Sequence, residues 1–165
     1  MRSLGLSNYR PADYQELISF GPLAVAPVVN QIECNPFMYR RDCLDFFASQ
    51  GIATVAYKPF LRGPGVEHPV VVAVAARHAG ATAGAVLLKW LLAKGIAVLP
   101  KSTHPGRMAA NLRCADEGQW ALSGHDEAAL DGVYDTAAGT ATFDAHFAKR
   151  AVQDPEKTTI AMGYA

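Results

Sequence analysis

Short apolar segments recur along much of this chain, and amphipathic stretches separate them. One of them, residues 52–57, is almost continuously apolar, which is typical of a strand covered on both faces. The others combine β-branched or aliphatic residues with turn-forming residues after them. Together they predict four strands, at residues 2–6, 27–32, 52–57 and 96–99.

The stretches between these strands have helical spacing and carry start and stop signals. Pro11 and Pro105 suit first helical turns, where no backbone N–H donor is needed. Thr82 is a suitable N-cap, and Gly51 and Gly95 suit the ends of helices. The predicted helices cover residues 11–20, 40–50, 69–78 and 83–94, and a further helix begins at Pro105.

Strands that alternate with helices indicate βα units and a parallel sheet. Right-handed crossovers allow either an open doubly wound sheet or a segment of a barrel, and spacing alone does not choose between them. Ser123 and Asp126 have the spacing of a capping box and predict one more helix, through Val133. We expect a domain over residues 1–135 and a tail over residues 136–165, to which we assign no function.

Length and charge narrow the classes of function. A chain of 165 residues has the length of one compact domain. Lys and Arg number 15, as do Asp and Glu, and this balance argues against a nucleic-acid partner. The longest apolar run, residues 70–76, is far shorter than the roughly 20 residues of a membrane span.

The cysteines and histidines show no spacing typical of a metal site. We expect the thiols of Cys34, Cys43 and Cys114 to be reduced and mostly buried, as in a cytoplasmic protein. We expect no signal peptide, because Met1 leads directly into the first of the motifs described below. The sequence thus predicts a cytoplasmic location without metal or membrane contact.

Residues 98–111, VLPKSTHPGRMAAN, combine the last predicted strand with a cationic turn and the start of a helix. A helix start offers backbone N–H groups and positive dipole charge to an anion. Lys101, Ser102 and Arg107 add an ammonium group, a hydroxyl and a guanidinium fork, which suit a phosphomonoester. Considered alone, the same residues also fit a turn whose cations are simply solvated.

Four motifs in order show what the chain is similar to: GLSNY at residues 5–9, NQIECNP at 30–36, AYKPF at 56–60, and LPKS with Arg107 and Asn111 at 99–111. With these motifs the chain resembles the aldo-keto reductases. The resemblance implies an α/β fold, namely a half TIM-type (β/α) barrel whose four parallel strands correspond to strands five to eight. It also implies an NADP(H)-binding oxidoreductase fragment whose substrates are small aldehydes or ketones.

The resemblance assigns a contact with the cofactor to each motif. Ser7, Asn8 and Gln31 would hydrogen-bond the nicotinamide carboxamide, which has both donors and an acceptor. Lys58, Phe60 and Ala110 depart from the family pattern, in which a small hydroxyl residue, Leu and Glu are usual. The other implied contacts are stacking on the nicotinamide by Tyr57, the pyrophosphate path at Pro59 and Phe60, the 2′-phosphate at Lys101, Ser102, Thr103 and Arg107, and adenine at Asn111.

No residue matches the Asp, Tyr, Lys and His set with which the family reduces carbonyls, because that set lies on the first half of its barrel. We therefore assign no catalytic residue. Two interpretations remain open. The chain is an NADP(H)-binding half, which needs a complementary half-barrel or forms a homo-oligomer. Alternatively, it is a non-enzymatic binding module or the product of a truncated reading frame.

The inward face of a half-barrel sheet is open, which would favour association. We expect the apolar residues of that face to come from Val28, Val29, Ile52, Val55, Ile96 and Val98.

Overall fold

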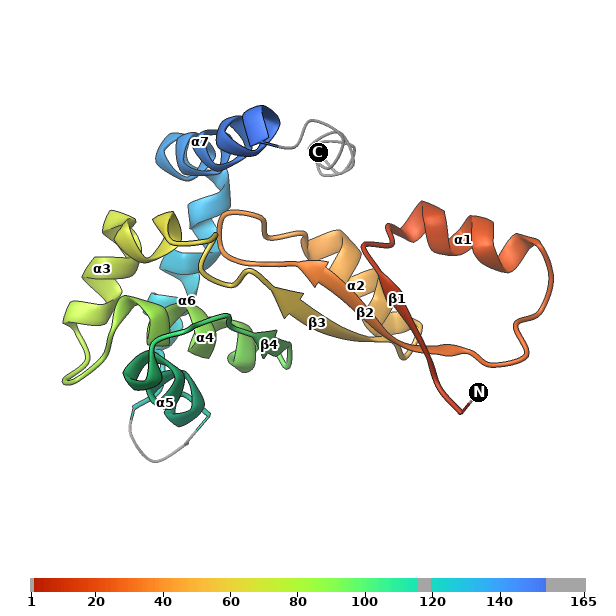
Figure 1. Cartoon of the computed structure of the whole chain (residues 1–165), viewed down its shortest axis with the longest axis horizontal. Helices are drawn as coiled ribbons and strands as arrows, with labels where there is room; N and C mark the ends of the chain where they lie inside the picture. The colour runs from red at the N-terminus through yellow and green to blue at the C-terminus, as the bar shows by residue number, and fades with distance from the viewer. Residues whose placement is uncertain (1, 116–119, 154–165) are drawn as a thin grey trace.

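The computed structural model describes residues 2–115 and 120–153. Strands β1 (Leu4–Ser7), β2 (Pro27–Glu33), β3 (Ala53–Tyr57) and β4 (Ala97–Leu99) form one parallel sheet in that order (Figure 1). The four predicted strands are confirmed. A doubly wound sheet reverses its strand order, whereas here each strand pairs with the next along the chain. The sheet is therefore a barrel segment.

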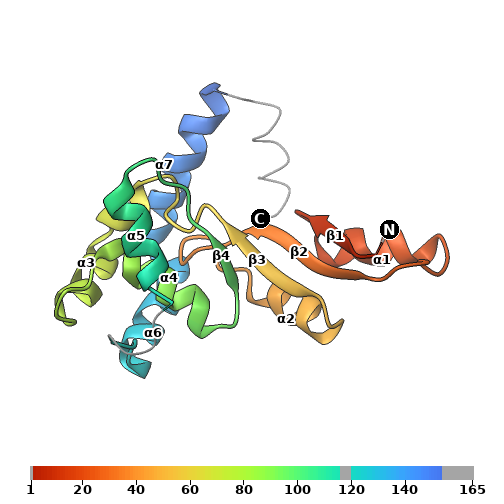
Figure 2. The ribbon, with the colours of Figure 1, turned by 60° about the horizontal axis from the view of Figure 1, so that its bottom comes forward.

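Helices connect and follow the strands, and each predicted helix is present. The segment after residue 136, for which the sequence pattern predicted no element, forms a helix as well. In Figure 2, α2 and α6 lie below the strands and this last helix, α7, rises above them. The elements are α1 (Pro11–Ser19), α2 (Arg41–Ser49), η1 (Pro64–Glu67), α3 (Pro69–Ala76), α4 (Ala83–Ala93), α5 (Pro105–Arg113), α6 (Gly124–Asp131), η2 (Gly132–Asp135) and α7 (Ala137–Gln153).

Local signals explain where the helices begin and end. The Thr82 hydroxyl accepts a hydrogen bond from the Ala85 N–H at 3.1 Å, so it caps α4 as predicted. Gly51 and Gly95 have φ angles of 69° and 70°, a left-handed conformation that glycine adopts at little cost after a helix. Within residues 2–115 and 120–153, no helix is long and apolar enough to cross a membrane.

The two faces of the sheet differ in their environment. One row across the sheet, Ile32, Ala56 and Val98, packs into a core with the helices, where Ile32 and Ala56 are buried. The alternate row places Ser7, Gln31, Val55 and Ala97 on the other face, where Ser7 and Ala97 are exposed. Of the six residues that the sequence offered for the open face, Ile52, Ile96 and Val98 belong instead to the helix-covered core, which corrects that expectation.

The outer edges of β1 and β4 pair with no strand in the part of the chain that the structure describes. Leu99, on the open face, is 48% exposed, and Phe20, just after α1, is 82% exposed. Burying an apolar side chain of this size stabilises by about 1.5–3 kcal/mol, a large share of the 5–15 kcal/mol that holds a domain together. We therefore expect the chain to form a homodimer or to require a complementary half-barrel.

Light scattering during size-exclusion chromatography measures this directly. Association should appear at micromolar concentration, together with a melting temperature that rises with protein concentration. A monodisperse monomer that melts cooperatively, and that stays folded after residues 136–165 are removed, would contradict the expectation.

Candidate functional site

The turn after β1 is held by a buried asparagine on the neighbouring strand. Asn30 is fully buried, and its amide donates to the Tyr9 carbonyl at 2.9 Å. The Asn8 N–H donates to the Gln31 carbonyl at 2.9 Å, which ties the turn to β2 a second time. Asn8 has a φ of 60°, a left-handed conformation that Asn tolerates better than most residues. These bonds fix the direction of the Asn8 side chain.

Three of the residues predicted at the nicotinamide end are connected by contacts, and the fourth is their neighbour in the sheet. The Tyr57 hydroxyl donates to Asn8 Oδ1 at 2.8 Å, although 49 residues separate them. Asn8 Nδ2 lies 3.4 Å from Ser7 Oγ, and Ser7 is the register partner of Gln31. Because carboxyl ends of parallel strands share one edge, the structure places a phenol, a hydroxyl and two amides there together.

The turn after β3 is held in the same manner. Asn35 is fully buried, its amide donates to the Lys58 carbonyl at 3.2 Å, and its Oδ1 accepts from the Phe37 N–H at 3.1 Å. Lys58, Leu61 and Arg62 have φ angles of 51°, 50° and 59°. Left-handed backbone at residues other than glycine costs energy and is concentrated at functional sites. The fully buried Leu61 side chain anchors this strained segment.

A pocket of about 1030 Å³ lies between this turn, the start of α4 and the start of α5. Four cationic side chains line it, and its described lining contains no Asp or Glu. Lys58 joins the pocket to the nicotinamide end, because its Nζ lies 5.0 Å from the centre of the Tyr57 ring. The predicted residues that line the pocket are Pro59, Phe60, Lys101, Ser102, Thr103, Arg107 and Asn111.

The other four predicted residues do not line this pocket. Ser7 and Asn8 instead border a second hollow of about 460 Å³ near α1, with Asp13 and Glu16 on its wall. The structure therefore separates the predicted site into two neighbouring clusters, one polar and neutral at the strand ends and one cationic at α5.

The start of α5 contains a residue that the sequence analysis did not assign. His104 is the N-cap, and its ring nitrogen Nδ1 accepts a hydrogen bond from the Arg107 N–H at 3.4 Å. The Ser102 hydroxyl in turn accepts from the His104 N–H at 3.2 Å. A Cβ atom added at Gly106 would meet the His104 ring at 3.2 Å, so the ring lies directly over the first turn.

Glu33 is the buried acid beside the pocket. Only 5% exposed, it lies 2.6 Å from Lys58 Nζ and 3.7 Å from His146 Nε2 on α7. Burial by itself would raise the pKa of the Glu33 carboxyl, but the neighbouring His146 and Lys58 side chains hold that pKa below its usual range. The Glu33 carboxylate thus positions Lys58 at the pocket and meets the tail helix α7.

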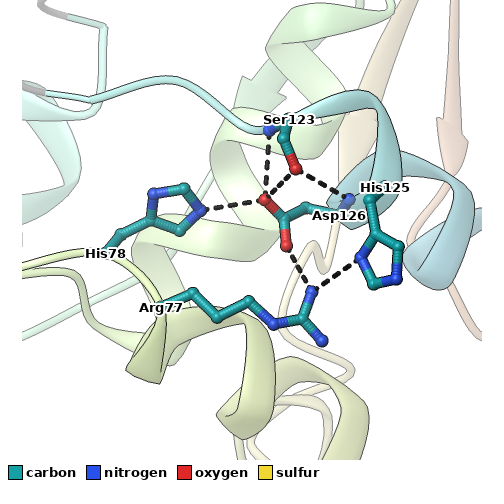
Figure 3. Close-up of polar contacts among 5 residues, drawn as sticks. All are labelled: Arg77, His78, Ser123, His125 and Asp126. Carbon is teal, nitrogen blue, oxygen red and sulfur yellow. Dashed lines mark hydrogen bonds and ion pairs between the residues drawn. The ribbon is translucent and has the colours of Figure 1, made fainter.

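Apart from the predicted site, a group of polar side chains joins the end of α3 to the start of α6 (Figure 3). Asp126 Oδ2 accepts from the Ser123 hydroxyl at 2.6 Å and lies 3.0 Å from His78 Nε2, and Arg77 donates to Asp126 Oδ1 at 2.6 Å. Ser, His and Asp are the residues of a hydrolytic triad, but there the His contacts the Ser. Here both contact the same carboxylate oxygen, so the cluster is a helix cap and an ion pair.

This cluster predicts a pH-dependent contribution to stability. Hydrogen bonds from Ser123, His78 and Arg77 hold the pKa of Asp126 well below its usual range. A depressed carboxyl pKa stabilises the fold above the pKa of an unfolded Asp, about 3.9, and the stabilisation is lost as the pH falls below that value. Asp126→Asn should therefore lower the free energy of unfolding by about 1–2 kcal/mol at pH 7, and by less at pH 3.

Urea unfolding at several pH values measures the difference. Glu127→Gln is the matched control, because Glu127 lies in the same first turn of α6. Equal losses for the two variants, or a loss for Asp126→Asn that is undiminished at pH 3, would contradict the assignment.

The three cysteines are buried and unpaired, as predicted, and burial raises the pKa of Cys34 to about 12. A thiol that stays protonated is a poor nucleophile. The described residues contain no cluster of His, Cys, Asp and Glu suited to a metal ion. The site brings together cations, hydroxyls, amides and a helix start, which are groups that can bind an anion.

Fold and site together define the class of protein: a partial (β/α) barrel with a cation-lined pocket at the carboxyl ends of its strands. No protein-family model matches the chain. An aldo-keto reductase of Mycobacterium sp. (strain JLS) is 36% identical over 137 residues, which cover 83% of this chain and 48% of that protein. The NADPH-dependent D-xylose reductase of Meyerozyma guilliermondii is 36% identical over 130 residues, or 70% of this chain and 40% of that protein.

Solved structures agree. The aldo/keto reductase of Brucella melitensis superposes with a TM-score of 0.68 at 35% identity, covering 78% of this chain and 47% of that one. The aldose reductase of Giardia lamblia gives a TM-score of 0.72 at 27% identity, with coverages of 80% and 44%. The chain spans about half the length of the relatives it matches. In sequence and fold it corresponds to a partial aldo-keto reductase, which confirms the resemblance inferred from its motifs.

Proposed function

We propose that this chain binds NADP(H) and forms the cofactor-binding part of an aldo-keto reductase-like oxidoreductase that acts on small aldehydes or ketones. The observation that carries the proposal is the pocket of about 1030 Å³, whose described lining contains four cationic side chains and no carboxylate. Such a lining attracts a phosphate-bearing ligand, although one of the four cations, Lys58, is already paired with Glu33. The name of the Meyerozyma relative supports the choice of NADPH.

The proposal assigns a part of the cofactor to each cluster. Lys101, Ser102 and Arg107 hold the 2′-phosphate at the start of α5, with Thr103 beside them. Pro59 and Phe60 line the pyrophosphate path. The remaining residues take the two rings: Asn111 contacts adenine, Ser7, Asn8 and Gln31 bind the carboxamide, and Tyr57 stacks on the nicotinamide.

The Tyr57 hydroxyl supports its role as a platform. It is engaged with Asn8 Oδ1, so the bond fixes the ring plane beside the amides that would hold the carboxamide. Lys58, an ammonium group in a place where the family usually has a small hydroxyl residue, faces the same ring from 5.0 Å. It adds positive charge next to the pyrophosphate path, while Glu33 limits that charge when no ligand is bound.

The alternative is a binding module, or the product of a truncated reading frame, without activity of its own. It is favoured by the lack of any match to the family's proton-donating residues among the motifs of this sequence. The main proposal and this alternative both predict a cytoplasmic protein. They differ in whether the chain reduces a carbonyl once a complementary half-barrel is supplied.

NADPH fluorescence tests the proposal. Titration of NADPH with the purified chain should shift or quench the NADPH emission, and added NADP⁺ should reverse the change by competition. Sedimentation with radiolabelled NADPH is an independent measurement. An unchanged spectrum and no co-sedimentation at millimolar cofactor would reject the binding function.

A further inference from the structure

His104 occupies the position at which an anion would meet the start of α5. Its ring covers Gly106, and its Nδ1 accepts a hydrogen bond from the Arg107 N–H at 3.4 Å. That N–H is one of the first-turn donors that a helix start offers to a phosphate. The ring also lines the pocket together with Lys101 and Ser102. In this state the histidine satisfies a donor that a bound phosphate would otherwise use.

The hydrogen bond from the Arg107 N–H indicates which nitrogen of the neutral His104 ring carries the hydrogen. Because Nδ1 accepts, it carries no hydrogen, and the neutral ring carries its hydrogen on Nε2. When the imidazole gains a proton, Nδ1 becomes a donor and no longer accepts from Arg107. Protonation therefore makes two changes at once, since it releases a backbone N–H and adds a positive charge. Both changes favour an anion at the same place.

We propose that His104 is a phosphate-recognising residue of this pocket, and that binding of a 2′-phosphomonoester is coupled to uptake of a proton by its ring. The inference rests on the proposed binding of NADP(H) and deepens it, because it adds a specificity-determining residue to the 2′-phosphate end. Histidine is the side chain that changes charge most readily between pH 5 and 8, so the coupling is tested in that range.

The charges around the ring agree with this direction. Lys58 at the end of β3, Arg62 in the following turn, Lys101 after β4 and Arg107 on α5 itself line the same pocket. Its described lining contains no carboxylate, tyrosine or cysteine. A phosphate dianion bound among these side chains attracts a positive charge on the ring, so ligand binding and protonation of His104 favour each other.

The variant His104→Asn separates two properties of His104, which are its role as the N-cap of α5 and its capacity to carry a positive charge. Asparagine is a strong N-cap, so it can accept from the first-turn N–H groups and keep α5 intact, but it does not titrate. Affinities of the unsubstituted chain and this variant for NADP⁺, adenosine 2′-monophosphate and NAD⁺ are measured from pH 8 to pH 6 by calorimetry, in two buffers of different ionisation enthalpy. His125→Asn, an exposed histidine outside the pocket, is the matched control.

Between pH 8 and pH 6, the native chain should gain roughly three- to tenfold in affinity for NADP⁺ and adenosine 2′-monophosphate relative to His104→Asn. It should also take up more protons on binding. The ligand's own phosphate titration is common to both proteins and drops out of the comparison. NAD⁺ should bind both equally, and His125→Asn should follow the native chain.

Three results would overturn the inference. Identical pH profiles for the native chain and His104→Asn would remove His104 from recognition while leaving NADP(H) binding intact. An equal effect on NAD⁺ would place the role of His104 away from the 2′-phosphate. Failure of every protein to bind NADP⁺ and adenosine 2′-monophosphate would reject the proposed function together with the inference.

Discussion

The isolated chain, supplied with NADPH and a simple aldehyde, is expected to turn over at least 10²- to 10⁴-fold more slowly than a complete aldo-keto reductase. That factor is roughly the contribution of a positioned general acid. Hydride transfer would leave an alkoxide that must gain a proton, and we expect from the motifs that this chain lacks the family's proton donor. The Tyr57 hydroxyl is engaged with Asn8 instead, and Lys58 with Glu33.

Consumption of NADPH, followed at 340 nm alongside product analysis, measures the rate. Tyr57→Phe is the informative variant, because it keeps the stacking ring and removes only the hydroxyl. A slow rate that Tyr57→Phe leaves unchanged agrees with protonation by water. Family-like turnover of the isolated chain would contradict the expectation, and its loss in Tyr57→Phe with unchanged NADPH affinity would assign proton donation to Tyr57.

Replacing Arg107 by alanine is expected to weaken NADP(H) binding about tenfold or more and to leave NAD(H) binding nearly unchanged. A charge-assisted hydrogen bond to a phosphate is worth roughly 1.5–3 kcal/mol, and the lower part of that range applies at an exposed position. NAD(H) has no 2′-phosphate, so the substitution removes no hydrogen bond from its complex. Alanine is the best helix former, and α5 should stay intact.

Arg113→Ala is the control for charge. Arg113 lies in the last turn of the same helix and does not line the pocket, so its removal changes the net charge equally. Calorimetric titration of both variants with both cofactors gives four affinities. Equal losses for NADP(H) and NAD(H) in Arg107→Ala, or a similar loss in Arg113→Ala, would refute the assignment of Arg107 to the 2′-phosphate.

Much of the site could be predicted because its residues lie in short motifs directly after strands. In parallel βα units these positions converge whatever the rest of the chain does. The α5 start was predictable for the same reason, since Pro105 marks a helix start and Lys101 precedes it closely. The buried asparagines Asn30 and Asn35 were missed as positioning residues. A signal existed, because both are polar residues that flank a buried strand segment in the NQIECNP motif.

Other features depend on contacts between distant parts of the chain. In the sequence, Lys58 is only a departure from the family pattern. The fold shows that its ammonium group lies 2.6 Å from the carboxylate of Glu33, which is 25 residues away in the chain. The left-handed backbone at Lys58, Leu61 and Arg62 has no local sequence signature, because glycine is the residue expected there. The approach of His146 to Glu33 likewise depends on α7, whose mixed composition carried no clear helical pattern.

By itself the sequence determined the order of strands and helices, their caps, and the relationship to aldo-keto reductases, because periodicity and capping act within a few residues. The tertiary structure decided which face of the sheet each strand residue occupies. It placed Ile52 and Ile96 in the core at 2% and 5% exposure, and it separated the site into two clusters. The physical reason is that register, burial and ion pairing are set between segments far apart in the chain, where local pattern carries no information.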